Sequence, residues 1–159
     1  MPTARRSRTI PASVEELWEV IRDPHHLPRW WPRVSRVEDV EGDAFTEVMI
    51  TRKGKTVRAD FNLLAGETGE RSLTWAQRVE GTPFARLLRS AETEVRLSPV
   101  ARYPSEGAPT GGGGSSTEVT IELRQTLTGV FPRLGGVMVK RAAAATIDEA
   151  LDGLERISA

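Results

Sequence analysis

The C-terminal stretch of the chain, residues 118–157, reads EVTIELRQTLTGVFPRLGGVMVKRAAAATIDEALDGLERI. Its first part, residues 118–128, alternates apolar and polar side chains with a period of two, which is the pattern of a half-buried strand. Gly129 breaks this alternation, and apolar residues then recur at helical spacing from about Pro132 to Ile157. The stretch therefore predicts a strand followed by one long amphipathic helix.

The same period of two recurs upstream of this stretch. It predicts strands over residues 34–40, 45–51, 57–64, 72–79 and 90–97, after a first strand that ends at Ile10. Sequential strands joined by turns form an antiparallel meander, and one face of such a sheet needs a cover. The final helix is the only predicted element long enough to cover it.

Two short helical segments are predicted between the first and second strands. Ser13 is placed to cap the first helix, and Glu16 three residues later completes a capping box. Asp23-Pro24 ends that helix, because a residue before proline is pushed out of the helical region. The aromatic turn 25–32 then includes a short second helix, and a further helical turn is predicted over residues 84–88.

Composition excludes several classes of function. The 159 residues suit one domain, with 22 basic and 22 acidic side chains that cancel, so no net field favours nucleic acid. The absence of cysteine excludes disulfides, thiolate metal sites and cysteine nucleophiles, and it fits a cytoplasmic location. No run approaches the roughly 20 apolar residues that a membrane helix needs, so no integral membrane contact is expected.

A segment rich in glycine and proline, residues 99–116, separates the last two predicted strands. Its run Gly111 to Gly114 has the composition of a phosphate-binding loop. However, it leads into a strand and no Lys-Ser/Thr follows, so no helix N-terminus would meet a phosphate. We interpret it as a flexible hairpin connection of one domain that spans residues 1–159, and we predict no cofactor.

Three stretches resemble the START-like (SRPBCC) superfamily of polyketide cyclase/dehydrase-like proteins: 9–21, the turn 23–34 with its Asp-Pro and Trp-Trp pairs, and 150–154. The resemblance implies an α+β helix-grip fold, in which a curved antiparallel sheet of about seven strands wraps around the C-terminal helix. It also implies a hydrophobic cavity between sheet and helix. Members include transport proteins, aromatase/cyclases and chaperone activators, so the fold does not decide the function.

The candidate ligand-binding residues are inward-facing side chains around that cavity. They are Phe61, Trp75 and Gln77 on the strands, Val137, Met138 and Arg141 on the helix, and Trp31 and Phe84 at the entrance. Most of the apolar ones are equally explained by a dry core. Gln77 would need a partner if buried, either Gln125, a water or a ligand oxygen. Arg141 would meet a ligand anion or a structural acid such as Glu47, whose face the pattern leaves open.

The remaining polar candidates have weaker support for a functional role. His25 and His26 are the only histidines, and no third ligand lies at close helical spacing, so no metal site is predicted. Arg6 and Arg8 share parity with Ile10 and face either the narrow end of the cavity or the solvent.

Two functions from different classes therefore remain, and the sequence does not choose between them. One is binding of an apolar small molecule, polyketide-, lipid- or isoprenoid-like, without chemistry. The alternative is a cyclase or dehydratase that uses a few polar cavity residues, with Gln77, Arg141 and His26 as candidates. A third reading, an interaction module that uses a sheet edge or the last helix, has no special support from the balanced charge. The oligomeric state stays open.

Overall fold

The computed structural model describes residues 2–51, 53–64, 71–100, 115–128 and 133–158. Seven strands and three α-helices follow one another in the order that the sequence predicts. They are β1 (Thr3–Ile10), α1 (Val14–Ile21), the 3-10 turn η1 (Pro24–His26), α2 (Leu27–Trp30), β2 (Val34–Glu41), β3 (Ala44–Ile50), β4 (Thr56–Leu64), β5 (Arg71–Gln77), the 3-10 turn η2 (Pro83–Arg86), β6 (Leu88–Pro99), β7 (Thr117–Leu127) and α3 (Arg133–Ser158).

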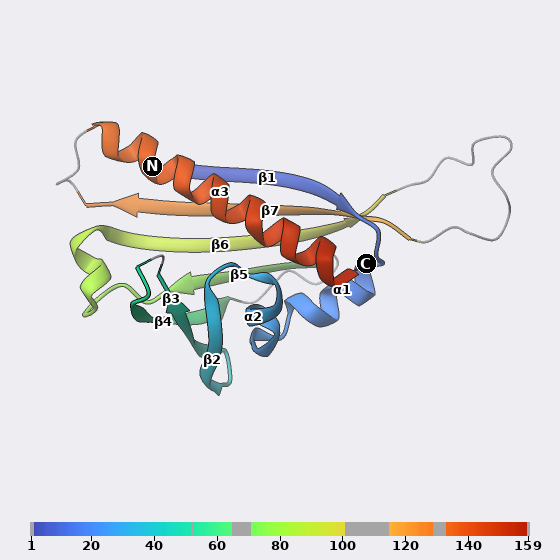
Figure 1. The fold of residues 1–159 in the computed structure, drawn as a ribbon, viewed down its shortest axis with the longest axis horizontal. Helices are drawn as coiled ribbons and strands as arrows, with labels where there is room; N and C mark the ends of the chain where they lie inside the picture. The colour runs from blue at the N-terminus through green and yellow to red at the C-terminus, as the bar shows by residue number, and fades with distance from the viewer. Residues whose placement is uncertain (1, 52, 65–70, 101–114, 129–132, 159) are drawn as a thin grey trace, which may run out of the picture.

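The strands form one antiparallel sheet in the order β1-β7-β6-β5-β4-β3-β2. Strands β2 to β7 are a meander, and β1 joins its far side by pairing with β7. The sheet curves, and α3 runs obliquely across its concave face (Figure 1). The helix packs mainly against β1, β7 and α2. The predicted α+β helix-grip fold, with a curved sheet of seven strands around a long C-terminal helix, is thus confirmed.

Two strands differ from their predicted bounds by two residues. The sixth strand, β6, extends two residues beyond the predicted 90–97 at each end, whereas the first strand ends at Ile10 as predicted. The fifth strand ends at Gln77 rather than at Val79, because the chain turns through Gly81 with a φ of +75°. Residues 101–114, including the predicted loop's Gly111 to Gly114, lie outside the described residues.

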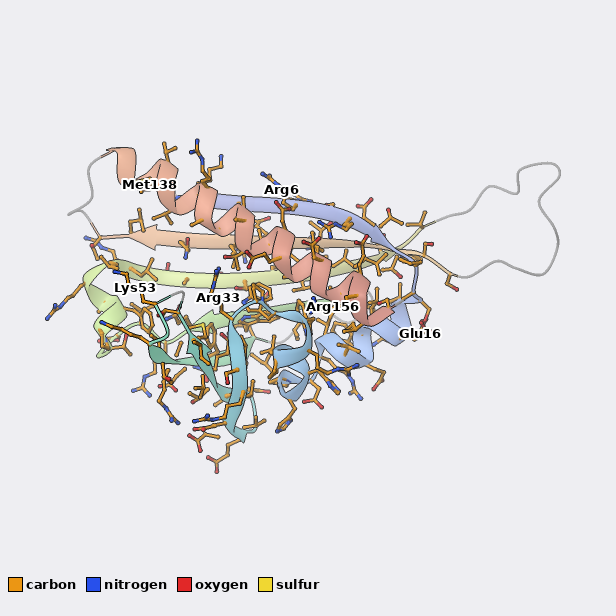
Figure 2. The ribbon with its side chains drawn as sticks, viewed as in Figure 1. Arg6, Glu16, Arg33, Lys53, Met138 and Arg156 are labelled. Carbon is orange, nitrogen blue, oxygen red and sulfur yellow. The ribbon has the colours of Figure 1, made fainter. Side chains whose placement is uncertain are left out.

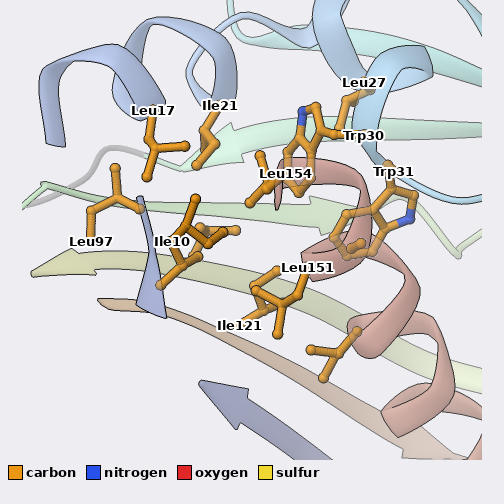
Figure 3. Packing of buried hydrophobic residues seen from close by; sticks show 14 of the residues in the cluster. Ile10, Leu17, Ile21, Leu27, Trp30, Trp31, Leu97, Ile121, Leu151 and Leu154 are labelled. Carbon is orange, nitrogen blue, oxygen red and sulfur yellow. The ribbon is translucent and has the colours of Figure 1, made fainter. Parts of the chain in front are cut away.

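The two short helices lie at one end of the sheet, where α2 packs against the C-terminal half of α3 and α1 packs against β6. Ser13 caps α1 as predicted, since its Oγ accepts a hydrogen bond from the Glu16 backbone N–H at 3.1 Å. Behind the cap, apolar side chains from the two helices, the sheet and α3 interdigitate (Figure 3). They include Ile10, Leu17, Ile21, Trp30, Ile121, Leu151 and Leu154, all nearly fully buried. This end of the molecule is a dry core.

Gly153 fixes the approach of α3 to α2. A Cβ atom at this position would overlap the carbonyl oxygen and Cα of Trp30, so only glycine permits the observed contact between the two backbones. Close packing of α3 on α2 therefore explains the glycine in the stretch 150–154, on which part of the family resemblance rests. No helix in the described part of the chain is long and apolar enough to cross a membrane.

Candidate functional site

Helix α3 divides into two halves with different side chains. Its C-terminal half buries Ile147, Leu151 and Leu154 completely against the sheet. Its N-terminal half instead ends in four consecutive alanines, residues 142–145, which are shorter side chains. Ala142 and Ala143 line the space between this half and the sheet. Because the strands below continue beyond the core, this difference in side-chain size leaves space between sheet and helix.

That space is a cavity of about 390 Å³, which we call the inner cavity. Its volume falls in the range of small-molecule sites. Its wall is formed by the concave faces of β3 to β7 and by one side of α3. The lining residues are Trp31, Glu47, Met49, Phe61, Trp75, Gln77, Leu87, Leu88, Ala91, Thr93, Leu123, Gln125, Leu127, Val139, Ala142, Ala143 and Thr146.

Tryptophan side chains form the wall between the inner cavity and the dry core. Trp31 contacts both Trp30 and Trp75 edge to face, with ring centroids 5.4 Å and 5.7 Å away. All three tryptophans belong to the hydrophobic core, and Trp31 and Trp75 also line the inner cavity. Of the two adjacent tryptophans, Trp31 alone also faces the inner cavity.

Polar side chains are set into this apolar wall at a few places. Gln77 pairs in register with Phe61, and Gln125 pairs with Ala91 on the neighbouring strand. Thr93 lies between Trp75 and Leu123 in the register of β5, β6 and β7. All the polar positions are on the concave face because they share the parity of the inward apolar residues.

Glu47 is the one ionisable residue among those lining the inner cavity. It occupies the middle of β3, opposite Ala59 on β4, and only 2% of its surface is exposed. Its Oε1 is buried and receives no hydrogen bond from any described residue. Burial raises the pKa of the Glu47 carboxyl to about 8, so the acid is mostly neutral at pH 7.

An open groove of about 640 Å³ adjoins the inner cavity, and we call it the outer groove. It runs between the N-terminal half of α3, the β3–β4 turn and η2. Met49 and Ala142 line both hollows, so the groove and the cavity are neighbours. Arg33 and Arg141 line the outer groove together with apolar side chains such as Met138 and Phe84.

The eight residues expected to bind a ligand separate into three groups. Phe61, Trp75, Gln77 and Trp31 line the inner cavity. Met138, Arg141 and Phe84 line the outer groove instead. Val137 faces neither hollow.

Val137 and Met138 were expected to face the inner cavity, but neither residue lines it. Val137 is 58% exposed beside β1, and Met138, near the start of α3 (Figure 2), is 71% exposed. Val139 is the inward member of this apolar run. Because all three residues are apolar, the run does not set the phase of the helix, which the buried residues from Ala143 to Leu154 fix.

The remaining polar candidates lie away from the inner cavity. Arg6 (Figure 2) and Arg8 do share a face with Ile10, but they lie beside α3. Arg6 is 3.9 Å from Asp148, and Arg8 pairs with Asp152. This side of β1 faces the acidic edge of the helix, not the cavity.

The histidines lie on η1. His25 is exposed, with Nδ1 2.9 Å from an oxygen of Asp23, and His26 is 3.3 Å from Arg29. The described residues contain no group of three potential ligands that could hold a metal. Of the three catalytic candidates, only Gln77 reaches the inner cavity.

Several lining residues escaped the sequence reasoning, above all Glu47. It shares parity with Phe45 and Met49, which was a usable signal. However, odd and even positions of the stretch 45–50 each hold two apolar residues and one polar residue, so alternation alone did not reveal which side faces inward. Thr93 and Thr146 were missed because threonine is common on either face of a strand or helix.

Comparison with known proteins agrees with this architecture. Residues 1–158 match the model of the family described as polyketide cyclase / dehydrase and lipid transport. No curated protein matches the sequence. Among solved structures, a START superfamily protein from Mycobacterium smegmatis has a TM-score of 0.72 at 15% identity, over 98% of this chain and 96% of that chain.

Two further solved structures are similar at low identity. XoxI from Bacillus cereus has a TM-score of 0.71 at 17% identity, over 99% of this chain and 96% of that one. The di-domain ARO/CYC BexL from the BE-7585A biosynthetic pathway has a TM-score of 0.75 at 16% identity, over 98% of this chain and 46% of its own. At these identities the likeness concerns the fold alone.

Proposed function

We propose, from the premise that the chain belongs to the polyketide cyclase / dehydrase and lipid transport family, that it binds an apolar small molecule in the inner cavity. Polyketides, lipids and isoprenoids are the chemical classes that suit such a site. The observation that carries this proposal is the space beneath Ala142 and Ala143 of α3, above an aromatic-lined sheet face. A fold that needed only stability would fill this space, since packed cores leave few voids larger than a water molecule.

The outer groove supports an entry route for such a ligand. It is lined mainly by apolar side chains and adjoins the inner cavity at Met49 and Ala142. Exposed apolar side chains at its rim, Met138 and Ile50, would contact a ligand before the ligand is enclosed. Grouped exposure of this kind is typical of binding surfaces.

The test is to fill the inner cavity from the sheet side. Ala91→Phe places a ring into the cavity from β6, opposite Gln125. We expect this variant to lose at least tenfold in affinity for apolar metabolites that raise the melting temperature of the wild type. Thermal-shift screening, followed by calorimetric titration of the metabolites that bind, measures the effect.

The matched control is Ala76→Phe on the neighbouring strand β5. Ala76 does not line the inner cavity and alternates with the inward residues Trp75 and Gln77, so its side chain is on the opposite face of the sheet. This variant should bind as the wild type does. Equal losses in both variants, or retained binding in Ala91→Phe, would contradict the inner cavity as the binding site.

A second candidate function is catalysis of the cyclase or dehydratase type. The observation that favours it is that Glu47 and Gln77, an acid and an amide, line one apolar cavity. A positioned acid contributes about 10²- to 10⁴-fold to a proton transfer. Incubation with a linear poly-β-ketone thioester, with products resolved by mass spectrometry, tests it: Glu47→Gln should lower product formation at least 100-fold. Product ratios equal to those of the protein-free reaction would contradict catalysis, and binding would remain as the only proposed function.

A further inference from the structure

Glu47 is a costly residue for the place that it occupies. A carboxyl transferred from water to an apolar site loses free energy unless partners replace its hydration. Its inward neighbours on β3 are Phe45 and Met49, and its partner across β4 is Ala59, none of which offers a side-chain hydrogen bond. A purely structural wall would be served by a leucine or a methionine here.

The charged groups on the surrounding elements do not replace the lost hydration of this carboxyl, because they pair elsewhere or face another hollow. On β4, Arg58 and Asp60 are hydrogen-bonded to Glu38 and Thr46 on the other face of the sheet. Arg33 is 3.3 Å from the Thr146 hydroxyl and 3.9 Å from Glu149, and Arg141 lines the outer groove. Among the described residues no cation pairs with Glu47, so burial alone acts on it, and it stays protonated near neutral pH.

A protonated carboxyl that faces an apolar cavity has an O–H group to donate. An uncharged carbonyl oxygen is the matching partner, because it accepts the hydrogen bond and brings no further donor or charge into the apolar wall. A hydrocarbon of the same shape would leave the donor unpaired, and a ligand anion would carry its charge into a lining without a cationic residue.

We propose that Glu47 is the ligand-selecting residue of the inner cavity and that its carboxyl donates a hydrogen bond to a carbonyl oxygen of the ligand. The ligand class is therefore an uncharged apolar ketone, ester or lactone. This inference rests on the proposed function, since it assumes that the inner cavity is where the ligand binds. It goes beyond it by naming the functional group that the cavity recognises.

The experiment uses two probes of one shape, 1-indanone with a carbonyl and indane without it. Chemical-shift changes of the indole N–H signals of Trp31 and Trp75, which line the cavity, report binding at this site. At pH 6 the wild type should bind indanone about tenfold more tightly than indane, as one hydrogen bond to a buried donor allows. The preference should fall as the pH rises from 7 to 9, because the ionised carboxylate no longer donates.

Two variants separate the hydrogen bond from shape. Glu47→Gln keeps a donor of the same length without a titrating proton, so its indanone preference should persist and become independent of pH. Glu47→Met keeps the length without a donor, so both probes should bind equally. Both variants retain an uncharged buried side chain, and their melting curves check that they fold.

The outcomes also separate this inference from the proposed function. Equal binding of both probes to the wild type, or an unchanged preference in Glu47→Met, overturns the role of Glu47 and leaves the inner cavity as a binding site. Failure of both probes to shift either indole signal at any pH counts against the inner cavity itself, and therefore against both proposals.

Discussion

Glu47 illustrates at the scale of one residue how a fold can set the chemistry of a side chain. On an exposed strand position a glutamate ionises near its ordinary pKa of 4.5, whereas burial raises the pKa of Glu47 to about 8. Glu38 on the adjacent strand shows the opposite case, since hydrogen bonds from Arg36 and Arg58 lower the pKa of its exposed carboxyl. Two glutamates in one sheet therefore carry different charges at neutral pH.

This difference predicts a pH dependence of stability. Between the unfolded pKa of 4.5 and the folded pKa of about 8, the folded state holds a proton that the unfolded state releases. Raising the pH therefore favours unfolding, and this contribution to stability is full below pH 4.5 and gone above the folded pKa. The slope is about −1.4 kcal/mol per pH unit in that window.

Glu47→Gln removes this titrating group. The difference in free energy of unfolding between the variant and the wild type should therefore shift in favour of the variant by roughly 4 kcal/mol as the pH rises from 5 to 8. Urea denaturation at several pH values measures this difference. Glu38→Gln is the control, because Glu38 is ionised in both states throughout this window and the slope should persist. A pH-independent difference between Glu47→Gln and the wild type would contradict the buried neutral acid.

At the scale of one element, α3 combines two tasks along a single helix. Its C-terminal half is a packing element that approaches α2 closely at Gly153, and its N-terminal half is the roof of the inner cavity. Amphipathic spacing predicted the helix, but it did not predict that the two halves differ. That difference follows from side-chain volume opposite the sheet, with alanine in one half and isoleucine and leucine in the other.

The two glycines of α3 therefore respond differently to the same substitution. Gly153→Ala should lower the free energy of unfolding by about 1–3 kcal/mol, because the added methyl group overlaps the Trp30 backbone. Gly136→Ala should raise it by about 0.5–1 kcal/mol, because its Cβ meets nothing within 4 Å and alanine is the better helix former. Thermal and urea unfolding of both variants test this, and effects of the same sign would refute the close contact.

At the scale of the whole molecule, the sheet and α3 enclose a dry core at one end and the inner cavity at the other. The tryptophans 30, 31 and 75 form the boundary between these compartments. Under the proposed function, packing and binding would thus be separated along one helix. A ligand would enter or leave at the cavity end while α1, α2 and the C-terminal half of α3 hold the core together.

This separation predicts unequal costs for matched truncations. Leu151 is a core residue and only 1% exposed. Leu151→Ala should therefore lower the free energy of unfolding by about 2–5 kcal/mol. Leu123 lines the inner cavity, so one side of its side chain already lacks contacts. Leu123→Ala should therefore lower the free energy of unfolding by less than about 2 kcal/mol. Equal costs in urea denaturation would mean that the cavity end is packed as tightly as the core.

The sequence by itself determined the elements of this protein and their order. Alternation with a period of two predicted the strands, helical spacing predicted α3, and Ser13 predicted the start of α1. These features depend on neighbours within a few residues, so they can be derived without the fold. They also sufficed for Phe61, Trp75 and Gln77 as lining residues, since each stands in a clean alternation.

Only the tertiary structure decided which residues meet around the inner cavity. The runs 48–50 and 137–139 are apolar at successive positions, so the sequence alone does not show which of their side chains face inward. Packing against segments far away in the sequence turned Glu47 inward and Val137 outward. The burial that keeps Glu47 uncharged comes from the same distant contacts, because desolvation depends on everything that surrounds a group and not on its place in the chain.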